Sequence, residues 1–269
     1  MATHHASVRT LSANQPRTSQ VIDMDTQEIT VRRTSVNLLD AEALDDIWKC
    51  YQRFATRGRE SFDRGLRSAD EMFLFHHVEH DELKGFTALK VLETYTDDAA
   101  EYVLYSYYAD LVPELRGLNL LQGLVLRRCL ELKLQRPGQR GYLMFTASTP
   151  TSYLWLTRNL YKYWPHRERT TPQHVTHLMK DVMARLDIDG WMPEKGVVRR
   201  HGTVRYHGED RDALTDESTK LDIAFYHQLN PGADEGDSLP CICPLSFANA
   251  MHLVRNMAAR AVRKVAPKQ

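Results

Sequence analysis

Tyr102-Val-Leu-Tyr-Ser-Tyr-Tyr-Ala-Asp-Leu-Val-Pro-Glu-Leu-Arg-Gly-Leu-Asn-Leu-Leu-Gln122 is the stretch that decides the predicted fold. It opens with Tyr, Val and Leu, which are typical of a strand. Val112-Pro113 ends that strand, because proline has no N–H for a sheet ladder. Apolar residues then recur at helical spacing, at Leu121, Leu124, Val125, Cys129 and Leu132. A strand, a short turn and a helix N-terminus gather N–H groups and partial positive charge, which favours binding of phosphate or another anion.

This stretch resembles motif A of the GNAT acyltransferase superfamily, a hydrophobic strand followed by Val-x-Pro-x-x-Arg-Gly-x-Gly-x-Gly/Ala and a helix. The part Val112-Pro113-Glu114-Leu115-Arg116-Gly117 fits, apart from one spacer residue. Asn119 and Leu121 stand where family members carry Gly and Gly or Ala, which limits how closely a pyrophosphate can approach. Asn159–Pro165 resembles motif B of the same superfamily, with Trp164-Pro165 in place of Gly-Phe.

The order of the predicted elements agrees with this resemblance. A strand at 28–34, a helix, an antiparallel hairpin at 71–92 and the strand 101–110 precede the motif-A helix. A strand at 141–147 and a helix at 150–163 follow it. We therefore expect an α+β fold with a GNAT-like central mixed, mostly antiparallel sheet flanked by helices and an extra C-terminal helix. Leu221–Tyr226 is expected to be a further strand of the sheet.

The whole chain divides into a disordered arm at 1–26, a GNAT-like core at 27–169 and a C-terminal extension at 170–269 that completes the sheet and adds helices. Its 35 basic and 35 acidic residues balance, so we expect no nucleic-acid partner. No apolar run reaches the ~20 residues of a membrane span, and the first residues lack the apolar core of a signal peptide. Four cysteines are too few for a disulfide framework, so we expect a reduced, cytoplasmic protein with no membrane partner.

The resemblance implies transfer of an acyl group from a thioester to a primary amine of an amino acid, a peptide or a small metabolite. The donor would be acyl-CoA or an acyl carrier protein (ACP) carrying phosphopantetheine. Its pantetheine arm would lie between the strands 101–110 and 142–147. A backbone N–H near Leu111 or Val112 would hold the thioester carbonyl. The phosphates would meet the N–H groups of the following loop and helix start, at Arg116, Gly117, Leu118, Asn119, Leu120 and Leu121.

Tyr161 matches the motif-B tyrosine that protonates the departing thiolate in many family members, and an ordinary Tyr pKa of ~10 keeps it protonated. The incoming amine must also lose a proton. The general base stays open among five residues, namely Asp110, Tyr105, Tyr107, His76 and His77.

Two other patterns point to partners or metals. His174-x-x-His177, on an expected helix, and Cys241-x-Cys243, in an expected loop, match no common zinc module, so we expect no metal. The terminal helix at 245–265 is basic, which would suit an acidic carrier protein. A catalytically silent GNAT-like module, which binds an acyl thioester or a protein partner, is the alternative function. Acyl length, acceptor and a homodimeric state stay open.

Overall fold

The structure is a computed structural model that describes residues 20–26, 29–96, 99–116, 118–200, 205–206 and 216–265. Its centre is a seven-stranded sheet in the order β1-β2-β4-β5-β6-β7-β11. Neighbouring strands run antiparallel, except that β6 and β7 are parallel. The sheet strands are β1 (Gln20–Thr26), β2 (Ile29–Ser35), β4 (Glu71–His77), β5 (Leu83–Thr96), β6 (Ala99–Leu111), β7 (Arg140–Ala147) and β11 (Leu239–Pro244).

Helices cover both faces of this sheet, and two small strand pairs lie outside it. The helices are α1 (Ala41–Tyr51), α2 (Arg59–Arg67), α3 (Leu120–Gln135), α4 (Pro150–Asn159), α5 (Gln173–Arg185), α6 (Glu217–Leu229) and α7 (Phe247–Val265). The small pairs are β3 (Ala55–Thr56) with β10 (Arg205–Tyr206), and β8 (Trp191–Met192) with β9 (Val197–Val198). None of the helices in the described part of the chain is long and apolar enough to cross a bilayer.

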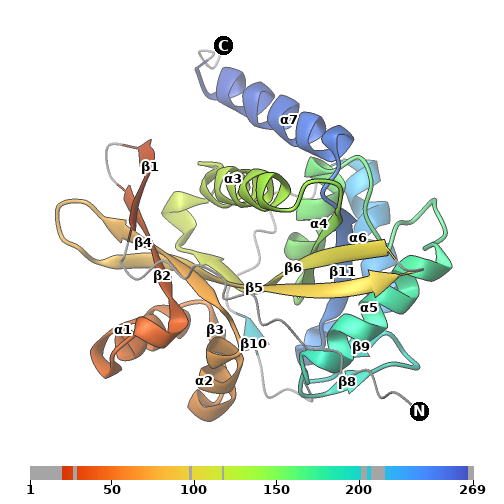
Figure 1. Cartoon of the computed structure of the whole chain (residues 1–269), viewed down its shortest axis with the longest axis horizontal. Helices are drawn as coiled ribbons and strands as arrows, with labels where there is room; N and C mark the ends of the chain where they lie inside the picture. Colours follow the sequence, from red (N-terminus) through yellow and green to blue (C-terminus); the bar gives the residue numbers. More distant parts are fainter. Residues whose placement is uncertain are drawn as a thin grey trace, which may run out of the picture.

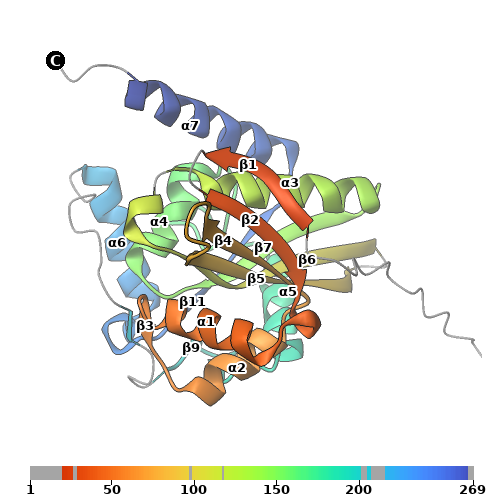
Figure 2. The same cartoon turned by 90° about the vertical axis from the view of Figure 1, so that its left-hand side faces the viewer.

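The helices form two layers, which Figures 1 and 2 show from two sides. α3, α4 and α7 lie on one face of the sheet, called here the α3 face, and α6 packs on α4. α1, α2 and α5 lie on the opposite face, called here the α1 face. Local signals start several of these helices. The Asp40 carboxylate caps α1 at the N–H of Ala43, and Thr149 and Ser152 form a capping box on α4.

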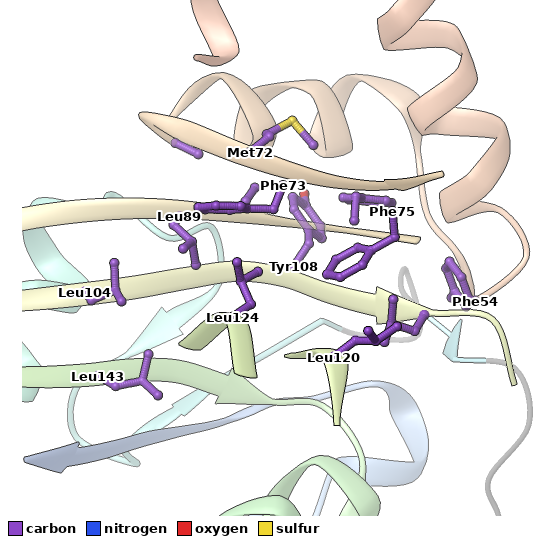
Figure 3. Close-up of a cluster of buried hydrophobic side chains, with 14 of the residues drawn as sticks. Phe54, Met72, Phe73, Phe75, Leu89, Leu104, Tyr108, Leu120, Leu124 and Leu143 are labelled. Carbon is purple, nitrogen blue, oxygen red and sulfur yellow. The ribbon is translucent and has the colours of Figure 1, made fainter. Parts of the chain in front are cut away.

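α3 packs on the sheet through residues that recur every four positions. Leu120, Leu124, Arg128 and Leu132 are buried. Figure 3 shows Leu120 and Leu124 next to β6, the strand that carries Leu104, and all three belong to one buried cluster. This spacing places one stripe of the helix toward the strands. The start of α3 is therefore held next to the end of β6.

The GNAT-like α+β architecture that the sequence predicts is confirmed by this strand order. A meander of antiparallel strands leads through β6, α3 and the parallel β7 into α4. The resemblance to the superfamily is thus confirmed at the level of the fold. Beyond residue 169 lie β11, which pairs with β7 at the edge of the sheet, and the helices α5, α6 and α7.

One predicted strand is wrong. Leu221–Tyr226 belongs to the helix α6, which Asp216 caps by accepting from the N–H of Thr219. Its buried residues are Thr219, Asp222 and Tyr226, a helical spacing that the apolar run conceals in the sequence.

The strand that completes the sheet is β11, which the sequence analysis took for a loop around Cys241. Its prolines explain why the segment was taken for a loop, because proline has no N–H for a sheet ladder and is rare in strands. The N–H and C=O of Ile242 bond to Trp164, on the side away from β7. Pro240 and Pro244 share that orientation by alternation, so their missing N–H groups cost β11 no bond to β7.

The structure describes the last seven residues of the arm expected at 1–26. These residues, 20–26, form β1, which pairs antiparallel with β2. Residues 1–19 lie outside the described residues.

A cluster of buried charges fixes α3 to the sheet. The carboxylate of Glu71 accepts from Nε of Arg128 at 2.5 Å and from Nε of Arg33 at 2.7 Å. We expect Glu71→Ala to lower the free energy of unfolding by about 3 kcal/mol, because the Nε groups of Arg33 and Arg128 lose their acceptor while their Nη1 groups keep Glu131 at 3.2 Å. Urea unfolding measures this change.

The control is Glu60→Ala, which removes an exposed carboxylate that pairs with Arg64 at 3.2 Å. It should change the free energy of unfolding by no more than ~0.5 kcal/mol. Equal losses in the two variants would contradict the role given to Glu71.

Candidate active site

An extra residue in β6 sets the geometry of the candidate site. β5 pairs Ala88 with Tyr108 and Leu89 with Ser106, so Tyr107 is a β-bulge. The Tyr107 ring lies 4.9 Å from that of Tyr105, and the Tyr108 ring lies 5.5 Å from that of Tyr51 in α1. Both neighbouring aromatic side chains therefore point to the α1 face.

Beyond the bulge, β6 and β7 part. Their parallel pairing runs from Glu101 with Arg140 to Ser106 with Phe145. β6 continues to Leu111 and β7 to Ala147 without pairing to each other. We call the segments 107–111 and 146–147 the splayed ends. They lie where the resemblance predicts a V-shaped gap for pantetheine.

The direction of the main chain at the end of β6 distinguishes the two N–H groups that could bind the thioester carbonyl. The N–H of Val112 donates to the carbonyl of Lys84 at 2.9 Å, so it is already used. Successive N–H groups along a strand point to opposite sides of it. Because the N–H of Val112 points to β5, the N–H of Leu111 points to the β7 side. Its carbonyl accepts from Nε of Arg116 at 3.3 Å. Of the two expected donors, Leu111 has the suitable orientation and Val112 does not.

The loop after β6 leads directly into α3. A 3-10 turn covers Pro113–Leu115, and Asn119 takes the left-handed conformation at φ 60°, which asparagine tolerates better than most residues. α3 then starts at Leu120 with no acidic residue in its first turn. Its first N–H groups have no intrahelical acceptor, which suits an anion. Gly117 lies outside the described residues.

The side chains at this loop differ in direction. Leu120 is buried and Leu121 packs on the core, whereas Leu118 is exposed. Leu120 and Leu121 can thus contribute only main-chain groups to an anion.

Asp110 is the titratable group at the splayed ends. It lies two residues beyond Tyr108, hence on the same α1 face of β6, and it is half-buried. Burial raises its pKa from 3.8 to about 7, against the opposing charge of Arg116. A carboxylate with that pKa can accept a proton near neutral pH.

Tyr107 differs from Asp110 in its proton state. Burial raises the pKa of Tyr107 above its ordinary value, and the Ser68 side chain opposes this to a smaller extent. The Tyr107 hydroxyl therefore keeps its proton at neutral pH. A neutral hydroxyl is a weak general base, so Asp110 is the better candidate for that role.

Tyr161 lies elsewhere. It follows the end of α4, is 56% exposed, and its N–H donates to Oδ1 of Asn249 at 3.0 Å. Asn249 also bonds the carbonyl of Pro244, which pairs with Tyr142 near the start of β7. The splayed end at Ala147 is five residues further along, roughly 16 Å at ~3.3 Å per residue. The structure does not bring Tyr161 to Asp110.

The remaining candidate bases are also apart from Asp110. His76 contacts the carbonyl of Asp81 through Nδ1 at 3.0 Å, and His77 accepts from the N–H of Glu79 at 3.2 Å. Both histidines are thus held by their own hairpin on β4, and β5 separates them from β6. Tyr105 is buried in the cluster that covers α5.

The two metal-like pairs lie on opposite faces of the sheet. Cys241 and Cys243 pack in the cluster that contains α4 and α6 residues, whereas their neighbour Ile242 packs against α5. His174 and His177 are on α5. Across the described ranges, no three His, Cys, Asp or Glu side chains gather as metal ligands would.

The sequence does not announce two residues that meet on the α1 face of this region, Arg57 and Tyr108. Nη1 of Arg57 donates to the Tyr108 hydroxyl at 3.1 Å, and that hydroxyl donates to the carbonyl of Phe62 at 3.2 Å. These bonds fix α2 to the splayed end of β6. They join residues about fifty positions apart, so no local pattern announces them.

No family model matches the chain, and no curated protein matches it. Solved structures do match in part. The N-myristoyltransferase of Saccharomyces cerevisiae with bound myristoyl-CoA has 13% identity and a TM-score of 0.35, over 48% of this chain and 32% of its own. This chain thus spans about a third of that enzyme.

Two further matches are similar in extent. An acetyltransferase of Trypanosoma brucei has 15% identity and a TM-score of 0.33, over 54% of this chain and 97% of its own. An aminoglycoside acetyltransferase from an uncultured soil metagenomic sample, in complex with sisomicin, has 14% identity and a TM-score of 0.35, over 54% of this chain and 93% of its own. Because these overlaps are partial, the fold assignment rests on the strand order.

The raised pKa of Asp110 has a consequence for stability. Between pH 3.8 and about 7 the folded state holds a proton at Asp110 that the unfolded state has lost. The free energy of unfolding contributed by this group therefore falls as pH rises through that window. We expect Asp110→Asn to be more stable than the wild type at pH 8, with the gain vanishing near pH 4. Urea unfolding at pH 4, 6 and 8 measures it, and an equal gain at all three would contradict the assignment.

Proposed function

We propose that this chain, whose strand order is that of a divergent GNAT fold, is an N-acyltransferase that moves an acyl group from a thioester to a primary amine. One observation carries the proposal. The N–H of Leu111 and the carboxylate of Asp110 lie on consecutive residues at the splayed end of β6, and the Asp110 pKa is about 7. A carbonyl-binding group and a base are thereby placed side by side.

The donor would bind along the splayed ends. Its phosphate would meet the first N–H groups of α3 and the Arg116 side chain, and its pantetheine would lie between β6 and β7. The thioester oxygen would accept from the N–H of Leu111. That N–H would also stabilise the negative charge that develops on this oxygen during attack, an effect worth ~10²–10³ in rate for comparable donors.

The acceptor would approach from the α1 face, where Asp110 lies. The amine nitrogen attacks the thioester carbon, Asp110 takes the proton that the nitrogen loses, and the carbon–sulfur bond breaks. The departing thiolate takes a proton from a hydroxyl, for which Tyr107 is the better placed of the two tyrosines. The proton held by Asp110 then returns to Tyr107 through solvent, so that the net transfer is from the amine to the thiol. No covalent enzyme intermediate is required. The acceptor class is a primary amine of an amino acid, a peptide or a small metabolite.

Two features bear on whether the donor is acyl-CoA or an acyl carrier protein. Asn119 occupies a position where the family carries a small residue, which leaves less room for a pyrophosphate than for the single phosphate of a carrier protein. α7 contains four basic residues, Arg255, Arg260, Arg263 and Lys264, and no acidic one. Both features favour an acyl carrier protein as an acyl donor in addition to acyl-CoA.

A catalytically silent module that binds an acyl thioester is the alternative function. The distance of Tyr161 from the splayed ends favours it, because the expected motif-B acid is not at the site. An acyl-transfer assay with acyl-CoA and acyl-carrier-protein donors and a panel of amines separates the two. Thioester binding without turnover in any combination would establish the silent module.

We expect Asp110→Asn to lower kcat by ~10²–10⁴, because the amide cannot accept the amine proton. The kcat/KM of the wild type should rise with pH to a plateau above about 7, after correction for the acceptor's own titration. Steady-state kinetics from pH 5 to 9 measure both.

Two tyrosine variants serve as controls. Tyr107→Phe should lower kcat, whereas Tyr161→Phe should leave it within error of the wild type. The opposite pattern would return the role of acid to Tyr161. An unchanged kcat in Asp110→Asn would remove Asp110 as the base.

Charge reversal on α7 tests the carrier-protein donor. We expect the triple variant Arg255→Glu, Arg260→Glu, Arg263→Glu to raise KM for a carrier-bound donor at least tenfold, since it repels an acidic partner. KM for the matching acyl-CoA should not change. Salt should weaken the wild-type preference in the same way. Equal KM values for the carrier-bound donor in both proteins would remove the docking role of α7.

A further inference from the structure

A buried tyrosine of the C-terminal extension reaches the splayed end of β7. The hydroxyl of Tyr226, in α6, donates to the carbonyl of Ala147 at 3.2 Å. Nδ2 of Asn230 donates to the same hydroxyl at 3.1 Å and to the carbonyl of Asp237 at 2.8 Å. Tyr226 and Asn230 are both 0% exposed, so water does not compete for these bonds.

A second contact holds the next residue of the same segment. The hydroxyl oxygens of Ser148 and Ser238 lie 2.9 Å apart. Ser238 is itself fixed, because its N–H and carbonyl bond to Val198. Two successive residues, Ala147 and Ser148, are thus tied to the extension by side-chain bonds.

These bonds replace a support that β6 does not give. β6 pairs with β7 only as far as Phe145, so no strand on that side determines where Ala147 lies. On its other side β7 pairs with β11, and Tyr226 adds a fixed point at its last residue.

We infer that Tyr226, oriented by Asn230, is a positioning residue that sets the β7 side of the donor-binding gap. The inference rests on the proposed function, because it concerns the place of the donor's pantetheine arm. The hydroxyl of Tyr226 bonds to Ala147 and Asn230, and the proposed proton transfers do not use it. This hydroxyl acts through Ala147, and a displacement of this edge alters donor contacts that are made equally before and during the reaction. Such a loss raises KM and leaves kcat nearly unchanged.

Tyr153 provides a matched control. It is also fully buried, its ring lies 5.8 Å from that of Tyr226, and its hydroxyl also donates to a backbone carbonyl, that of Pro165, at 3.1 Å. Pro165 lies in the segment after α4 and not at the splayed ends. Tyr226→Phe and Tyr153→Phe therefore remove the same group from the same aromatic cluster, but only one of these hydroxyls holds the gap.

The experiment measures donor KM, kcat and the thermal midpoint of the wild type and of both variants, with acyl-CoA as the varied substrate. Calorimetric titration with the same acyl-CoA gives its affinity without turnover. We expect similar falls of the thermal midpoint in both variants. Donor KM and Kd should rise about tenfold in Tyr226→Phe only, with little change of kcat. Ser148→Ala, which removes the second bond, should raise both constants less, and it keeps the test valid if Tyr226→Phe fails to fold.

Equal donor affinity in all proteins, or equal losses in Tyr226→Phe and Tyr153→Phe, would overturn the inference. Donor binding without turnover in the wild type would remove the proposed reaction, yet the comparison of Kd values would still decide the role of Tyr226. Absence of both binding and turnover would overturn the inference together with the proposed function.

Discussion

The extra residue in β6 is the constraint on which the candidate site depends. A bulge bends a strand and increases its twist, so β6 can pair with β7 over its first half and leave it afterwards. The bulge at Tyr107 also shifts the alternation of side chains by one position. Asp110 consequently faces α1, whereas in an unbulged strand it would face α3. The opening of the gap, the direction of the carboxylate and the direction of the Leu111 N–H are thus three results of one local irregularity.

α3 must then be oriented so that its first turn faces this opening. Its apolar stripe alone leaves some freedom of rotation and sliding, because leucine side chains repack easily. The bonds of Arg128 and Arg33 to Glu71 are directional and link α3 to β4 and β2. Buried ion pairs add little net stability, since each charge loses its hydration. Their value here lies in the geometry that they impose on the helix.

Much of the fold could be predicted because its signals are local. Val112-Pro113 ends β6, the apolar run of β7 indicates a strand covered on both faces, and both features depend on neighbouring residues. The errors came from elements whose state tertiary contacts decide. Leu221–Tyr226 has the composition of a strand and folds as a helix that packs on α4. β11 contains prolines, and only its position at the sheet edge makes them acceptable.

The candidate site could likewise be predicted only where local sequence signals determine it. Asp110 was among the possible bases because it ends a strand, but its raised pKa depends on burial that no sequence pattern reports. Tyr161 was assigned by its place in a motif. α4 ends at Asn159, so the residues after it follow the loop toward α7 and not the line of the helix. The place of a residue in a motif therefore predicts its place in the structure only if the helix or strand that carries the motif has the expected length.

The C-terminal extension is part of the site and not an addition to a finished core. Where a strand stops pairing with its parallel neighbour, it loses the backbone hydrogen bonds on that side. Its position then depends on the hydrogen bonds on its other side. β11 supplies that second ladder, Tyr226 bonds Ala147 at the end of β7, and Ser238 bonds the next residue, Ser148. Without these contacts β7 would present two open edges near the splayed ends, a state that proteins avoid. The gap in β6–β7 pairing and the extension that closes the sheet behind it are therefore two parts of one structural solution.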